Sequence, residues 1–274
     1  MTQTRILPRS APLRRLALAV ALLAGTAAQA VVSPAQPPAV DGSLADIAYG
    51  NGGNVFQLDP LLFVQGLGSA GNPQAVTALN PLLKYTFSVT GADSGLMTIA
   101  YHVRNTSATD SFSDLRFMVF ANPDSDGATF LDALSETWGP AAAGDPVRRE
   151  GRAFDPVANI KAGIAVNGNL TEGGAPLDAA CTAAPGCDAT VGLQWNAPLL
   201  GPGETFQVRL GLSDDGRHLS TRWIDVTAVN APDTVLTLSG VSAVVAVPEP
   251  GSWALMLAGL TGVGLLAQSR RRTG

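Results

Sequence analysis

Hydrophobic and polar side chains alternate residue by residue in several stretches of the chain. The segments Leu83–Thr90, Met97–Arg104 and Phe206–Ser213 place apolar residues at every second position, with mostly polar or small residues between them. In a β-strand this period of two puts one set of side chains in the core and the other in water. The connection Gly91–Gly95 is built from Gly, Ala, Asp and Ser, which favours a hairpin between the first two segments.

Other short apolar stretches extend the pattern, and Gly, Pro, Asp and Asn separate them. We expect strands at Val55–Leu58, Leu61–Gln65, Leu115–Phe120, Ile160–Val166, Ala189–Trp195, Ser220–Val226 and Val235–Val245. A helical stripe is suggested only at Thr129–Trp138. Many short strands between turn residues predict an all-β fold, an antiparallel β-sandwich.

The patterned body covers residues 31–246, which is enough for one large sandwich or two smaller units. The least patterned stretch, Gly139–Asp155, is the natural seam between two units. We favour one elaborated sandwich.

Residues 1–30 have the three parts of a secretory signal peptide. Four arginines precede the apolar run Leu16–Gly25, and small residues ending in Ala28-Gln29-Ala30 follow it. A run of ten apolar residues is too short to cross about 30 Å of hydrocarbon, which argues against a membrane anchor. We expect cleavage of this signal helix after Ala30 and export through the secretion translocon.

Residues 247–274 form a second targeting segment at the other end. A Pro-Glu-Pro triplet is followed by 17 uncharged residues, 251–267, and then by three arginines. A helix of that length spans about 25 Å, the short end of what a bilayer accepts, so a single transmembrane helix is expected. The arginines should stay cytoplasmic while the body is exported.

The order and position of these three parts resemble the PEP-CTERM sorting signal of Gram-negative bacteria. The resemblance covers about a tenth of the chain and implies processing by an exosortase, with transient membrane anchoring and then a cell-surface or extracellular location. A plain anchor that is never processed is the alternative. By position, the resemblance assigns recognition to Pro248, Glu249 and Pro250, and the C-terminal stop to Arg270, Arg271 and Arg272.

Two stretches of the body are similar to secreted bacterial immunoglobulin-like modules. These are residues 82–105 and the run LLGPGETFQVRLGLSDD from Leu199 to Asp215. The similarity is one of pattern and implies an immunoglobulin-like sandwich without implying any chemistry.

Composition and charge narrow the function classes. Only 14% of the residues are charged, and the 30 Gly and 19 Pro argue against a helical bundle or coiled coil. The body holds ten Lys and Arg against 21 Asp and Glu, a net charge of about −11. Because such a surface repels phosphate backbones, nucleic acid is not an expected partner.

The two cysteines, Cys181 and Cys187, lie in the exported body and bracket a Pro-Gly turn. An oxidising compartment, an even number and this spacing favour one disulfide between them. A zinc site would have to recruit both distant histidines, so we expect no metal there.

Several motifs look chemical but have simpler interpretations. Gly66–Gly71 fits G-x-G-x-x-G, but Asn72-Pro73 follows and no amphipathic helix is expected, so we interpret it as a Gly-rich loop and expect no cofactor. His102 is expected on a polar strand face, and His218 in a turn near Asp215 and Ser220. Three residues so close in sequence cannot easily form a hydrolase triad.

Three further sets of residues leave alternatives open. Asp124 and Asp126, and likewise Asp214 and Asp215, lie in acidic segments that are candidates for Ca²⁺ binding but suit ordinary turns better. Trp195 and Trp223 are expected in the core, although an exposed tryptophan would instead stack on sugar rings. The sequons at Asn105 and Asn169 are interpreted as coincidental.

We therefore expect an exported, non-enzymatic surface or extracellular-matrix protein, associated with exopolysaccharide or biofilm matrix. The first alternative is a carbohydrate-binding module, which requires aromatic residues on an exposed face. The second is an extracellular glycoside hydrolase, which requires a pair of carboxylates in a cleft.

Overall fold

The computed structural model describes residues 32–39, 42–50, 52–124, 134–139, 148–153, 164, 168–170, 189–228, 235–246 and 258–261. The signal peptide predicted at 1–30 lies outside these ranges, and so do Cys181, Cys187, Pro248, Glu249, Pro250, Arg270, Arg271 and Arg272. The disulfide and the individual roles of the sorting residues stay predictions.

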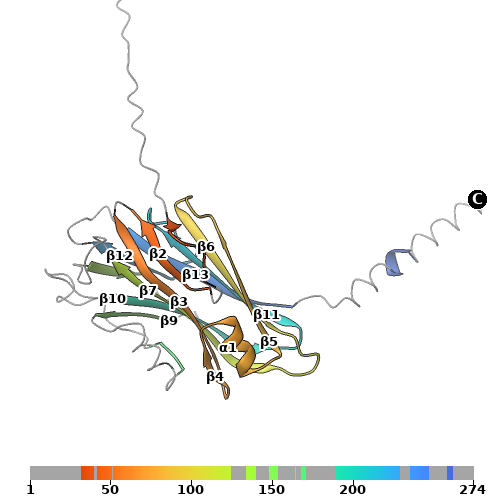
Figure 1. Cartoon of the computed structure of the whole chain (residues 1–274). Helices are drawn as coiled ribbons and strands as arrows, with labels where there is room; N and C mark the ends of the chain where they lie inside the picture. The colour runs from red at the N-terminus through yellow and green to blue at the C-terminus, as the bar shows by residue number, and fades with distance from the viewer. Residues whose placement is uncertain are drawn as a thin grey trace, which may run out of the picture.

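The described strands form two antiparallel sheets (Figure 1). The first, called the β3 sheet, has the order β1 (Ser33–Pro34), β2 (Leu44–Tyr49), β3 (Gly53–Val64), β7 (Phe112–Asp124), β10 (Ala189–Leu200) and β9 (Arg148–Ala153), with β4 (Gly68–Ala70) also paired to β3. The second, called the β11 sheet, has the order β5 (Leu83–Thr90), β6 (Leu96–Asn105), β11 (Glu204–Ser213), β13 (Val235–Ala246), β12 (Trp223–Ala228) and β8 (Leu134–Trp138).

The two sheets bury their apolar faces against each other. One continuous core cluster contains residues of both sheets, and the rings of Tyr101 on β6 and Phe117 on β7 lie 4.8 Å apart, centroid to centroid. Gly240 on β13 lies against the fully buried Trp195 on β10 so closely that an added Cβ would be 2.4 Å from the ring. The all-β fold with two antiparallel sheets is therefore confirmed, whereas the immunoglobulin-like assignment stays a prediction.

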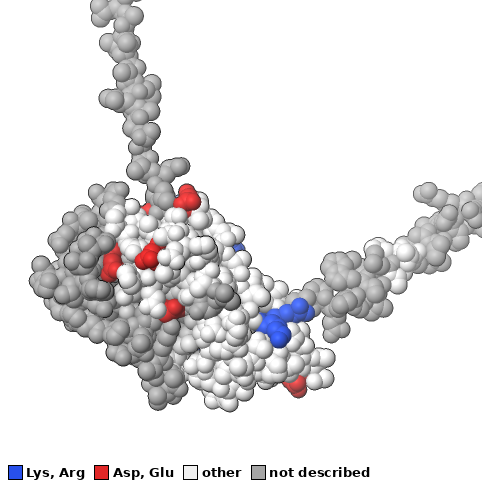
Figure 2. Space-filling view, viewed as in Figure 1, with Lys and Arg blue, Asp and Glu red and all other residues white. Residues whose placement is uncertain are grey.

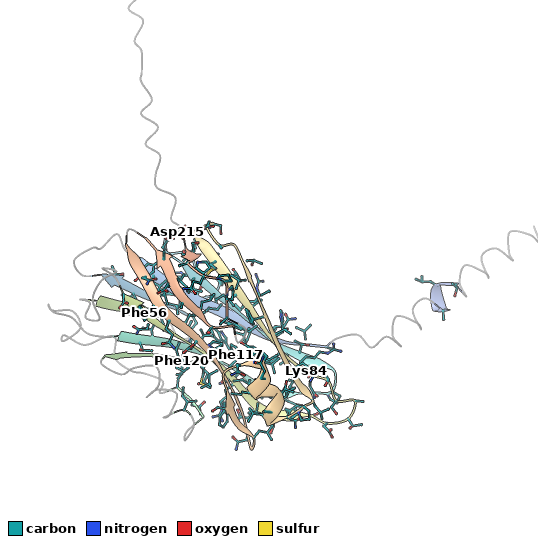
Figure 3. The ribbon with its side chains drawn as sticks, in the orientation of Figure 1. Phe56, Lys84, Phe117, Phe120 and Asp215 are labelled. Carbon is teal, nitrogen blue, oxygen red and sulfur yellow. The ribbon has the colours of Figure 1, made fainter. Side chains whose placement is uncertain are left out.

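Strand β7 is buried on both of its faces, which explains its nearly continuous apolar sequence. Phe117 and Val119 face the core between the sheets, while Met118 and Phe120 pack with Leu61 in a second cluster (Figure 3). Alternation of apolar and polar residues identifies strands with one buried and one exposed face. It therefore could not predict that β7 is buried on both faces.

One expectation about helices is wrong, and one short helix was not expected. Residues Leu134–Trp138 of the suspected helical stripe form the edge strand β8, paired with β12. Within the expected Gly-rich loop, Gly68–Ala70 form the strand β4 paired with β3. A short helix, α1 (Pro73–Leu79), follows it, and the Asn72 side chain caps this helix by accepting a hydrogen bond from the Ala75 amide at 2.7 Å. The cap and the proline in the first turn suit a helix start.

No helix within the described residues is long and apolar enough to cross a membrane. Of the transmembrane helix predicted at 251–267, the described part is residues 258–261, which are helical.

Candidate functional site

An irregularity in β3 turns an aromatic side chain out of the sheet. The pairing of β3 with β7 shifts between Val55 and Gln57, so Phe56 has no partner in the register and forms a β-bulge. The bulge breaks the alternation, and Phe56 and Gln57 are both exposed although they are neighbours. Phe56 is 51% exposed, an unusual position for a large apolar ring. Bulges commonly re-aim side chains beside functional sites.

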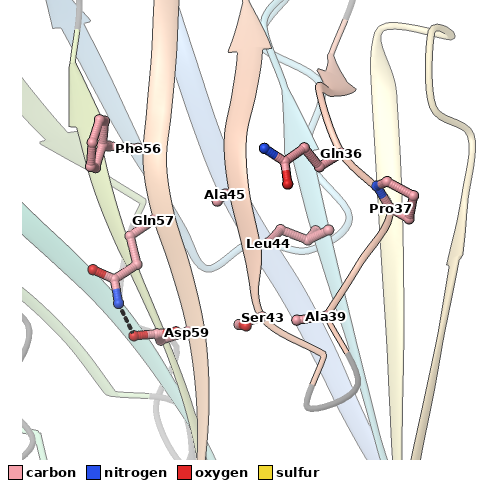
Figure 4. A pocket seen from close by; sticks show the side chains of 9 residues that line it. All are labelled: Gln36, Pro37, Ala39, Ser43, Leu44, Ala45, Phe56, Gln57 and Asp59. Atoms are coloured by element: carbon pink, nitrogen blue, oxygen red, sulfur yellow. Dashed lines mark hydrogen bonds between the residues drawn. The ribbon is translucent and has the colours of Figure 1, made fainter.

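A hollow of about 340 Å³ lies beside this bulge, between the segment before β2, β2 itself and β3 (Figure 4). Its volume falls in the range of small-ligand sites. The described residues that line it are Gln36, Pro37, Ala39, Ser43, Leu44, Ala45, Phe56, Gln57 and Asp59.

The lining combines one aromatic ring with several planar polar groups. The Gln57 side-chain amide donates a hydrogen bond to the Asp59 carboxylate, which fixes both groups on the wall of the hollow (Figure 4). Gln36 contributes a second amide from the opposite side. An apolar ring beside amide and carboxylate groups matches the two surfaces of a sugar, whose ring faces are apolar and whose hydroxyls need donors and acceptors.

The acidic character of this face is visible in Figure 2, where carboxylate side chains are spread over the surface carried by β2 and β3. Among the described lining residues Asp59 is the one carboxylate. Residues such as Phe56 and Gln57 escaped the sequence interpretation because the bulge removes the period-two signal at the point where the site begins.

A second aromatic site lies on the outer face of the β11 sheet. Trp223 is half-buried instead of belonging to the core, so the expectation for this residue is wrong, whereas Trp195 is fully buried as expected. The His218 ring stacks on Trp223 with centroids 4.4 Å apart, and its Nε2 lies 3.3 Å from Asp225 Oδ1. The stacking covers one face of the Trp223 indole, and the contact with Asp225 engages one ring nitrogen of His218. Together they hold the His218 ring in place.

The residues near His218 do not form a catalytic triad. Asp215 accepts hydrogen bonds from Arg217 Nε at 2.7 and 2.9 Å, and Ser220 Oγ donates to the Arg222 carbonyl at 2.8 Å. The Arg217 guanidinium bonded to it holds the pKa of the Asp215 carboxyl below its usual range. The acid therefore pairs with an arginine, and His218 pairs with a different acid.

The acidic turns give no support to a calcium site. Asp214 Oδ2 accepts a hydrogen bond from the Gly50 amide at 2.8 Å, which ties the turn after β11 to the turn after β2. Asp124 is the last residue of β7, and Asp126 lies outside the described residues. Within the described ranges no group of three or more His, Cys, Asp or Glu side chains is placed to hold a metal ion.

Asn105 is a structural residue at the end of β6. It is fully buried, and its Nδ2 donates to the carbonyls of Asp110 and Gly201 at 2.7 and 2.9 Å, while Oδ1 accepts from the Ser107 amide. A glycan on this nitrogen would require the chain to open, so the sequon at Asn105 is coincidental in the folded body.

His102 lies half-buried on the outer face of the same strand, where the alternation places it.

The comparisons with known proteins bear on the C-terminal end of the chain. Residues 246–272 match the family model of the PEP-CTERM protein-sorting motif. No curated protein and no solved structure matches the chain. The matched region starts at Ala246, the last residue of β13, so the motif follows the folded body directly. The chain carries a PEP-CTERM protein-sorting motif and is thereby identified as an exported protein that an exosortase sorts.

Proposed function

We propose that this protein is a non-enzymatic component of the cell surface or extracellular matrix, associated with exopolysaccharide. The sorting motif carries the proposal, because it implies an exported protein that an exosortase processes at the membrane. Three hydrogen-bonded pairs among the candidate histidine and acidic side chains support a non-enzymatic role: His218 pairs with Asp225, Asp215 with Arg217, and Asp214 with the Gly50 amide.

The experiment is an intact-mass measurement of the protein in membrane and medium fractions of its native host, with and without the exosortase. We expect a species lacking residues 1–30 and the tail in the medium of the wild type, and a membrane species that keeps the tail in the deletion strain. A variant with Pro248, Glu249 and Pro250 changed to Ala should reproduce the deletion phenotype. A medium species of the same mass in both strains would contradict sorting by the exosortase.

The hollow beside Phe56 favours carbohydrate binding as the activity of the body. An exposed ring on a bulge, flanked by Gln36, Gln57 and Asp59, offers stacking together with hydrogen bonds. The glycoside hydrolase alternative needs a second carboxylate within about 5–10 Å of the first, and the described lining supplies Asp59 alone.

Affinity electrophoresis through exopolysaccharide purified from the host tests this activity. We expect Phe56→Ala to weaken binding about tenfold, since the ring supplies most of the stacking area. Leu199→Ala is the matched control, because Leu199 is an equally exposed apolar residue (55%) on β10, away from the hollow. Equal retardation of both variants and the wild type would exclude the hollow as the binding site.

A further inference from the structure

The outer face of the β11 sheet carries a basic row at the end nearest the sorting motif. The register of the sheet aligns Lys84 on β5 with Arg104 on β6, Arg104 with Thr205 on β11, and Thr205 with Val245 on β13. Residues paired directly across strands point to the same side of a sheet, so Lys84 and Arg104, which are both exposed, share one face and one row with Val245. Figure 3 shows Lys84 near this end of the sheet.

A third cation extends the row into a patch. Arg209 on β11 pairs with Ala100 on β6 and with Val241 on β13, two rows further from the end of the sheet. Arg209 is also exposed. We call Lys84, Arg104 and Arg209 the basic patch.

The basic patch contrasts with the charge of the whole body. The rows that contain it bring Thr86, Ser88, Ala100, His102, Gln207 and Ala243 to the same face and no Asp or Glu. Within the described part of the chain, none of the three cations forms an ion pair. Figure 2 shows Lys and Arg atoms gathered in one place on this side of the molecule, with one red group below them. Three unpaired cations on an acidic body form a local site for a negative partner.

Two exposed valines of β13 share this face with the basic patch. Val245 is in the row of Lys84 and Arg104 and Val241 is in the row of Arg209, and their side chains are 39% and 40% exposed. Exposed apolar side chains next to Lys and Arg are the composition of surfaces that rest on lipid headgroups.

The distance to the predicted membrane segment is short. Four residues separate Ala246 from Gly251, the first residue of the uncharged segment, and they span at most about 18 Å even when fully extended. Before the tail is removed, the row of Lys84 and Arg104 is therefore held within reach of the headgroups, and Arg209 lies about 14 Å further along the strands.

We propose that the basic patch docks the body onto anionic lipid headgroups while the tail is in the membrane. The inference rests on the proposed export and anchoring and adds an orientation: the end of the β11 sheet faces the bilayer, and the Phe56 hollow on the other sheet stays open to the outside. Headgroup phosphates neutralise Lys84 and Arg104 first, because these two share a row with Val245.

Lysine footprinting of the full chain tests this orientation, because the chain has two lysines, Lys84 and Lys161. The chain is reconstituted into vesicles of phosphatidylcholine alone or with one third phosphatidylglycerol and acetylated, and the ratio of modification at Lys84 to that at Lys161 is measured by mass spectrometry. We expect the ratio to fall about fivefold in anionic vesicles, the effect of one basic residue at such a surface, and to recover in 0.5 M salt.

Variants separate the patch from general charge effects. Arg104→Gln should restore most of the Lys84 reactivity, and Arg209→Gln less, since it lies further from the end of the sheet. Arg217→Gln is the matched control: it removes one positive charge from the opposite end, where Arg217 contacts the β5–β6 hairpin at Ser94, and should change nothing.

Three results would overturn the proposal. If the ratio is the same in neutral and anionic vesicles that both carry the chain, headgroup docking is wrong while the anchoring stands. If the chain fails to float with either vesicle, the anchoring itself fails. If soluble polygalacturonate protects Lys84 and anionic vesicles do not, the patch binds an acidic polysaccharide instead of lipid.

Discussion

The outer faces of the two sheets differ in regularity and in charge. On the β3 sheet the bulge at Phe56 interrupts the pairing, and the interruption coincides with a hollow lined by an aromatic ring, amides and one carboxylate. On the β11 sheet, β5, β6, β11 and β13 keep an unbroken register, and the result is a regular face with rows of aligned side chains. A hollow selects a small group by shape, whereas a charged row suits an extended surface. The two binding surfaces that we propose therefore differ in kind and lie on the outer faces of different sheets.

This comparison requires that the two sheets pack directly against each other. A substitution of Gly240, which lies at their contact, should have the largest effect on that packing. An added Cβ would be 2.4 Å from Trp195 and 2.7 Å from the Arg209 carbonyl, so Gly240→Ala should lower the free energy of unfolding by about 3 kcal/mol. Urea denaturation measures the loss. Trp195→Phe in the same chain should recover part of it, and full additivity of the two changes would contradict a direct contact.

The position of the basic row depends on Asn105, which ends β6 next to Arg104. Asn105→Ala leaves the carbonyls of Asp110 and Gly201 and the Ser107 amide without this partner. We expect a loss of about 2–3 kcal/mol in the free energy of unfolding, measured by the same denaturation. Asn196→Ala is the control, since Asn196 is half-buried and accepts one hydrogen bond from Gln194. An equal loss of unfolding free energy in the two variants would contradict a special structural role for Asn105.

The two surfaces should be separable from the fold. Phe56 and Arg104 are both exposed, so Phe56→Ala and Arg104→Gln should each leave the free energy of unfolding within about 0.5 kcal/mol of the wild type. Thermal denaturation of the two variants checks this. A loss above about 1.5 kcal/mol in either would mean that the residue stabilises its sheet.

The smallest expected effect is the pH dependence from Asp215. Because Arg217 lowers the pKa of this carboxyl in the folded chain, its contribution to stability is present above the ordinary value of 3.8 and is lost as the pH falls through the lower folded pKa. Arg217→Gln should therefore reduce stability at pH 6 and leave it nearly unchanged at the acid end. Urea midpoints of both chains at pH 6 and below pH 3 check the sign, and an equal difference at both pH values would contradict it.

The sequence predicted the regular sheet better than the irregular one. Alternation located β5, β6 and β11 to within one or two residues, because each has one buried and one exposed face. The Phe56 site was missed, since a bulge exposes two neighbours and so erases the period that marks a strand. Helix α1 was missed although Asn72 and Pro73 are a recognisable cap and first-turn residue, because seven residues show no full amphipathic stripe.

The surface charge shows the same limit. Net charge along the chain predicted an acidic body, and composition gave no sign of a basic patch, because Lys84, Arg104 and Arg209 meet only through the register of three strands. The sorting motif was predictable for the opposite reason: its three parts are contiguous, so the order of residues contains the whole signal.

The tail is joined to β13, an interior strand that pairs with β11 over ten residues and with β12 over five. A pull on the tail along the direction of β13 loads these rows of hydrogen bonds in shear, all at once, instead of unzipping them one after another. An attachment of this kind resists force well. If the body is tethered through this tail, as we propose, its mechanical load falls on an interior strand that is paired on both sides.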